Sequence, residues 1–181
     1  MAVPLNYQSI LGIYTALQNE AAKKPADGNT VKEIAITDAA NNNAPITPAQ
    51  LFSAFLPKAQ EDGLMEAFTA AFEPSLGAYF FYDDKGAWPG YILTMKQSGI
   101  DTITLTERLQ KIEGESYANF FLSPPGTASA FKTGQVAEKY INRFASFPQA
   151  GASFSYGLYG NYLIISTSQG GLMKALELLK L

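Results

Sequence analysis

The sequence predicts an α+β fold, in which a mainly antiparallel sheet packs on helices after a largely helical N-terminal section. Two pairs of apolar, alternating segments are each joined by a polar turn, the pattern of a β-hairpin. Two further segments repeat leucines at the spacing of one buried helical face. With 181 residues, 47% of them hydrophobic, the chain can form one sizeable core. We therefore expect a single domain, with residues 1–74 mostly helical and residues 75–181 forming the sheet and its helices.

Helical patterns interrupted by prolines run through the N-terminal section. Residues 5–24 carry apolar side chains at the spacing of an amphipathic helix, which Pro25 ends. Residues 26–45 are rich in Asn, Asp and Gly around a short apolar piece. This composition predicts loops around an edge strand over residues 31–36.

Residues 46–72 predict two short helices. Thr47 and Gln50 form a capping box with Pro48 at the first helical position, so a helix is expected to run to Leu56. A second helix is expected over residues 64–72, because its apolar side chains share one side and Pro74 follows.

Two hairpins are predicted in the second half of the chain. Residues 77–82 and 91–96 are rich in aromatic and branched side chains and flank a polar turn that ends in Gly86. Residues 154–158 alternate in polarity and lead through the two-residue turn Gly160-Asn161 into a second apolar strand.

Helices are predicted after each of these hairpins. Thr104 and Glu107 resemble a capping box, and Leu105, Leu109 and Ile112 share one helical face. Ser168 is a predicted N-cap for a final helix with Leu172, Leu176 and Leu179 on one face. Residues 117–122 are predicted as a strand, whereas residues 136–147 fit a helix or a strand.

Composition excludes several classes of function. The formal net charge of −3, without charge runs, gives no electrostatic basis for binding nucleic acid or an anionic membrane. The chain has no Cys and no His, so it lacks the usual zinc ligands and the usual base of a serine hydrolase. We predict no cofactor and no metal site. No apolar stretch approaches the length of about 18 residues that spans a bilayer.

An aromatic cluster around the single Trp is the first candidate binding site. Tyr79, Trp88 and Tyr91 fall on the predicted first hairpin, and exposed aromatic rings on a sheet stack on sugars or on peptide prolines. The alternative, which we prefer for Trp88, is a position in the core, because large aromatic side chains are usually buried.

Charged side chains provide the remaining candidates. Arg143 lies among aromatic residues, where a stacked or bidentate structural role is expected and a binding role is the alternative. Glu113 and Glu115 are the best candidates for an acid/base pair, although acids near a helix end usually face solvent. We predict no catalytic residue.

Five short segments together resemble uncharacterised, membrane-anchored surface proteins of bacteria with small genomes. The similarity covers residues 51–181 and is carried by WPGYIL (88–93), LQKIE (109–113), NRF (142–144), SYG (155–157) and YLIISTS (162–168). It implies no known activity, but it implies a strand over residues 139–145 and an N-terminal transmembrane anchor. No anchor is present in this sequence, and Met1 is either a native start or, as the resemblance implies, a boundary after such an anchor.

These observations leave three hypotheses for function. The first is a non-catalytic extracytoplasmic domain of the cell envelope, membrane-anchored in the native protein, that binds a protein partner or an envelope polysaccharide. The second is a carboxylate-dependent enzyme that acts on a glycan or peptide. The third is an intracellular scaffold or oligomer subunit, which would place the chain in the cytoplasm.

Overall fold

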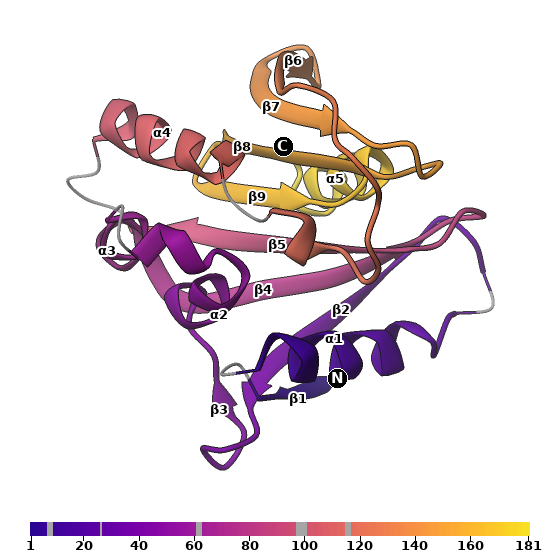
Figure 1. Ribbon diagram of the computed structural model, residues 1–181. Helices are drawn as coiled ribbons and strands as arrows, with labels where there is room; N and C mark the ends of the chain where they lie inside the picture. The colour runs from indigo at the N-terminus through magenta and orange to yellow at the C-terminus, as the bar shows by residue number, and fades with distance from the viewer. Residues whose placement is uncertain (7–8, 26, 61–62, 97–100, 115–116) are drawn as a thin grey trace.

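One nine-stranded sheet organises the chain in the computed structural model, which describes residues 1–6, 9–25, 27–60, 63–96, 101–114 and 117–181 (Figure 1). The strands follow the order β1-β2-β4-β5-β9-β8-β7-β6, and β3 pairs with β2 beside this path. The β1–β2 pair is parallel and every other pair is antiparallel. The strands are β1 (Ala2–Leu5), β2 (Thr30–Asp38), β3 (Ala44–Pro45), β4 (Phe72–Tyr82), β5 (Ala87–Met95), β6 (Lys132–Val136), β7 (Tyr140–Ser146), β8 (Ser153–Tyr159) and β9 (Tyr162–Ser166).

Helices cover both faces of this sheet. Figure 1 shows α5 behind the sheet, on the opposite face from the other labelled helices. The α-helices of the described residues are α1 (Ile10–Ala21), α2 (Pro48–Phe55), α3 (Leu64–Ala71), α4 (Thr102–Gln110) and α5 (Gln169–Leu178). The 3-10 segments are η1 (Pro57–Gln60), η2 (Lys111–Gly114) and η3 (Tyr117–Phe120). No helix among the described residues has the length and apolar character needed to cross a membrane.

Aromatic side chains fill the core between the sheet and the front helices. The Tyr91 ring of β5 contacts Phe52, Phe55 and Phe120, with ring centroids 5.6 to 5.9 Å apart. Phe120 also contacts Phe154 of β8, with ring centroids 5.3 Å apart. The cluster therefore joins α2, η3 and two strands that lie far apart in sequence.

The fold class predicted from the sequence is wrong. The sheet dominates the structure and is mixed, and the N-terminal section is not largely helical because it supplies β1, β2, β3 and the first residues of β4. The predicted first helix begins only at Ile10, where Ser9 caps it by accepting a hydrogen bond from the Gly12 N–H. The residues just before it include Leu5 at the end of β1, paired in parallel with Asp38. Four-residue β1 is too short to show a strand period.

The predicted edge strand at residues 31–36 is also wrong in its position. β2 spans nine residues and lies inside the sheet, between β1 and β4. Ile34 and Ile36 face the front helices and are buried, whereas Glu33 and Ala35 face the opposite side and are exposed. Only one face of β2 is covered, so only alternate residues need to be apolar, and the apolar pattern in the sequence is therefore short.

Local turn and cap signals predicted several elements correctly. The structure confirms both hairpins, the Thr47–Gln50 capping box, the Ser168 cap and a strand over Tyr140–Ser146. Two local predictions are wrong. The cap of α4 is Asp101, whose carboxylate accepts from the Ile103 and Thr104 N–H groups, and the predicted strand at residues 117–122 is the 3-10 segment η3.

Candidate functional site

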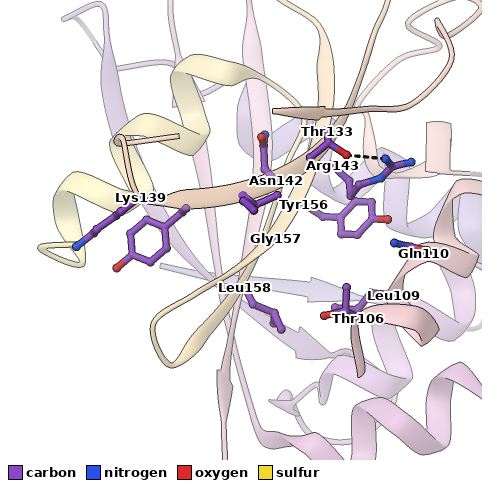
Figure 2. A pocket seen from close by; sticks show the side chains of 12 residues that line it. Thr106, Leu109, Gln110, Thr133, Lys139, Asn142, Arg143, Tyr156, Gly157 and Leu158 are labelled. Atoms are coloured by element: carbon purple, nitrogen blue, oxygen red, sulfur yellow. Dashed lines mark hydrogen bonds between the residues drawn. The ribbon is translucent and has the colours of Figure 1, made fainter. Parts of the chain in front are cut away.

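A groove of about 490 Å³ lies between α4 and strands β7 and β8 (Figure 2). Helix α4 supplies one wall, and the front face of the two strands supplies the other. The residues that line it are Thr106, Leu109, Gln110, Thr133, Lys139, Tyr140, Ile141, Asn142, Arg143, Tyr156, Gly157 and Leu158.

Strand alternation brings the wall residues of the sheet together. Ile141 and Arg143 are two residues apart on β7 and therefore share a face. Arg143 pairs with Tyr156 of β8, and Leu158 follows two residues later on the same face. The face is continuous with Leu163 of β9, which pairs with Leu158.

Helix spacing supplies the opposite wall. Thr106, Leu109 and Gln110 are three and four residues apart on α4 and so lie on one side of it. Leu105 and Leu109 are buried and hold the helix against the core. The N-cap at Asp101 fixes where the helix begins.

At one end of the groove, Glu113 and Arg143 form a bidentate ion pair. Arg143 donates from Nε to Glu113 Oε1 and from Nη2 to Oε2, both at 2.7 Å. The Tyr156 hydroxyl donates to Glu113 Oε1 at 2.6 Å, and Arg143 Nη1 donates to Thr133 Oγ1 at 3.0 Å. Figure 2 shows the Arg143 and Tyr156 side chains directed to the same end of the groove as Gln110.

These contacts shift the ionisation of all three groups. Partial burial opposes ionisation of Glu113, but the hydrogen bonds from Arg143 and Tyr156 outweigh it and hold the pKa of this carboxyl below its ordinary value. The hydrogen bonds to Glu113 raise the pKa of Arg143. Burial, together with donation to the Glu113 carboxylate, raises the pKa of Tyr156. Glu113 is therefore a charged, fully engaged acceptor at neutral pH.

The structure places Tyr79, Trp88 and Tyr91 in the core. Their exposed fractions are 3%, 2% and 1%, so these side chains form no accessible aromatic platform. Tyr79 and Tyr91 also point to opposite faces of the sheet, because Tyr79 donates to the Gly171 carbonyl of α5 whereas Tyr91 packs on α2.

Trp88 has a specific structural partner. Its indole Nε1–H donates to Asp83 Oδ1 at 2.9 Å, and the same oxygen accepts from the backbone N–H groups of Lys85 and Gly86. The position in the core that we preferred for Trp88 is confirmed.

Of the charged candidates, Arg143 lies in the groove and shows the expected bidentate geometry, with Glu113 as its partner. Glu115 lies outside the described residues, so the proposed pairing of Glu113 with Glu115 stays a prediction. The described residues contain no cluster of three or more metal-ligating His, Cys, Asp or Glu side chains.

Several groove residues were not identified from the sequence. Tyr156 and Thr133 become neighbours of Arg143 only through the pairing of β6, β7 and β8, and Lys139 lies at the other end of the groove. The sequence signal that could have found them is the alternation of Ile141 with Arg143, read together with the strand register. No protein-family model, curated protein or solved structure matches this chain.

Proposed function

We propose that this chain is a non-catalytic binding domain that holds a protein partner or an envelope polymer in the groove between α4 and β7–β8. The observation that carries the proposal is an open groove in which exposed apolar and fixed polar side chains lie side by side. Ile141 is 68% exposed on the sheet wall, beside the anchored Arg143 guanidinium. Binding sites combine apolar contact area with a few positioned polar groups in this way.

The state of Glu113 favours binding over acid catalysis by this residue. A general acid needs a raised pKa and a proton to donate near neutral pH. The pKa of Glu113 is lowered, and both of its oxygens already accept hydrogen bonds. The cluster therefore serves better to fix the Arg143 side chain than to transfer a proton.

The cellular location is also part of the proposal. An extracytoplasmic position in the cell envelope rests on the sequence resemblance alone, and a cytoplasmic position is the alternative. The binding proposal depends on the groove and holds for either location.

An NMR titration tests the proposal directly. Backbone amide spectra of the ¹⁵N-labelled protein are recorded with an uncharged chitotriose probe and with a pool of short peptides. We expect at least one probe to shift the amides of β7, β8 and α4. Ile141→Asp should abolish these shifts, because it places a carboxylate on the sheet wall of the groove.

Leu11→Asp is the matched control, since Leu11 is 72% exposed and lies on α1, away from the groove. Binding that survives in Ile141→Asp as well as in Leu11→Asp contradicts the proposal. An absence of shifts at the groove with every probe contradicts it as well.

A further inference from the structure

We infer that the ligand of this groove is an extended peptide that places a carboxylate against Arg143 and apolar side chains against Ile141 and Leu158. The inference rests on the proposed function and specifies its ligand. Three observations lead to it: the positive charge of the described lining residues, the donors of the Arg143 guanidinium at one end, and the aromatic rings near the groove, which are buried or already in contact with other side chains.

The described residues that line the groove carry only positive charge. Lys139 and Arg143 are the charged residues among those that line the groove, although the whole chain has a formal net charge of −3. Glu113 is the ion-pair partner of Arg143, and Glu138 precedes Lys139 in the exposed turn, but neither of these acids lines the groove. A ligand that carries a carboxylate is therefore the complementary partner.

The guanidinium of Arg143 retains donors for such a carboxylate. Glu113 occupies the edge formed by Nε and Nη2, and Thr133 accepts one N–H of Nη1. Glu113 and Thr133 engage three of the five N–H groups, and the Tyr156 hydroxyl also interacts with the guanidinium, which leaves at least one N–H of Nη1 or Nη2 for a ligand. The Arg143 side chain is 29% exposed, so these donors can be reached from the groove. The contacts with Glu113 fix the plane of the guanidinium before a ligand binds, which lowers the entropy cost of binding.

The middle of the groove is apolar and matches a short extended chain. Leu109, Ile141 and Leu158 line the groove, and Figure 2 shows Leu158 between the Lys139 side and the Arg143 side in this view. Lys139 and Arg143 are four residues apart on or beside β7, which corresponds to about 13 Å along a strand. A peptide of about four or five residues in extended conformation spans this distance.

The aromatic side chains favour a peptide over a sugar. Sugar sites usually present an exposed aromatic ring face for stacking. Tyr79, Trp88, Tyr91 and Tyr156 are buried. The partly buried Tyr140 ring also lines the groove, but it already contacts the Tyr159 ring and the Lys139 ammonium. The donors and branched apolar side chains of the groove suit peptide carboxylates and aliphatic side chains.

Binding of three forms of one peptide tests the inference. The probe is an acetylated five-residue peptide of alternating Ile and Ser, made with a free C-terminal carboxylate, with a C-terminal amide, or as the amide with one Ser replaced by Glu. We expect at least one charged form to bind about tenfold or more tightly than the neutral amide. The comparison of the two charged forms identifies whether a chain terminus or an acidic side chain is the natural group.

Variants assign the effect to the groove. Lys139→Gln changes a side chain about 13 Å from the carboxylate at Arg143 and should weaken binding of the charged peptides only slightly, whereas Lys58→Gln, at an exposed lysine of η1, should not change it. The double variant Glu113→Gln/Arg143→Gln removes both charges together, so no unpaired carboxylate is left behind, and it should abolish the preference for the charged peptides.

Two results overturn the inference. Equal affinity of the neutral and charged peptides overturns it, because the carboxylate then contributes nothing. Binding of chitotriose at the groove without binding of any peptide also overturns it, yet leaves the proposed binding function intact. If no probe shifts groove amides, the proposed function fails together with the inference.

Discussion

Asp83 connects the β4–β5 turn to the buried Trp88 through one carboxylate oxygen. Oδ1 accepts the indole N–H and two backbone N–H groups of the turn. Asp83→Ala should lower the free energy of unfolding by about 1–3 kcal/mol, because it leaves a buried indole N–H without its acceptor. Chemical denaturation, followed by the fluorescence of Trp88, measures the loss.

Two variants show whether the lost acceptor is the cause. Asp83→Asn keeps an oxygen at this position and should lose much less stability than Asp83→Ala. Asp84→Ala changes the exposed neighbour in the same turn and should have little effect. A loss from Asp84→Ala as large as that from Asp83→Ala would contradict the role assigned to Asp83.

Glu113 should make the stability of the protein depend on pH. Its pKa is below the ordinary value of 4.5 in the folded chain, so the unfolded chain binds the proton more readily. The stabilisation is complete above pH 4.5 and is lost as the pH falls through the folded pKa. Glu113→Gln should cost about 1–2 kcal/mol at pH 7, allowing for solvent contact of the ion pair.

The measurement is the free energy of unfolding of the wild type and of Glu113→Gln from pH 7 to pH 3. The difference between the two should shrink below pH 4.5. Glu20, whose pKa is also lowered, is present in both proteins and cancels in the difference. A difference that stays constant across this range is the result that opposes the prediction.

At the scale of elements, the β6–β7 turn contains two residues with an unfavourable backbone conformation. Ala137 and Glu138 have φ values of 49° and 60°, in the left-handed region that favours glycine. Glu138→Gly should therefore raise the free energy of unfolding by about 0.5–1 kcal/mol. Gln135→Gly, at an extended position of β6, is the control and should lower it. Thermal unfolding of the two variants distinguishes relief of strain from a general effect of glycine.

Strands β4 and β5 make a close contact that only glycine permits. Tyr79 pairs with Gly90, and a Cβ atom at Gly90 would lie 2.0 Å from Tyr79 Cζ. Gly90→Ala should destabilise the fold by about 2–3 kcal/mol through this overlap. The double variant Tyr79→Ala/Gly90→Ala should cost less than the sum of the two single changes, and strict additivity in a double-mutant cycle would exclude the clash as the cause.

Elements with local signals could be predicted from the sequence. Thr47 and Gln50 are three residues apart, and Gly160-Asn161 joins directly paired strands, so these elements needed no knowledge of distant residues. The cap of α4 was missed because Asp101, three residues before Thr104, caps the helix first and places Thr104 inside its first turn. Residues 117–122 were expected to form a strand, but Tyr117 and Phe120 use their rings to fill the core from a 3-10 segment.

At the scale of the whole molecule, the arrangement of the sheet and the site depended on non-local pairing. β9 lies between β5 and β8, although about 70 residues separate it from β5. Glu113 and Arg143 are 30 residues apart and meet only after α4 has packed beside β7. The spacing of residues along the chain does not encode these pairings, so the groove could not be predicted from the sequence. Arg143 alone could be named as a candidate, because of the aromatic residues around it in the sequence.

The central position of β9 predicts cooperative unfolding. β9 pairs with both β5 and β8 and so joins the N-terminal and C-terminal strands into one sheet. Ile165 of β9 is fully buried, and Ile165→Ala should cost about 2–5 kcal/mol. Trp88 fluorescence and far-ultraviolet circular dichroism should report one shared transition in both proteins. Two separate transitions would show that the halves of the sheet unfold independently.

The central position of β9 also sets the order in which the sheet can form while the ribosome synthesises the chain. The β5 edge that receives β9 has no partner until residues 162–166 have been made. Until then, the nascent chain exposes the backbone N–H and C=O groups of an aromatic-rich strand, an arrangement that invites pairing with another chain. Translation speed and chaperone access should therefore affect the yield of this protein more strongly than its final stability suggests.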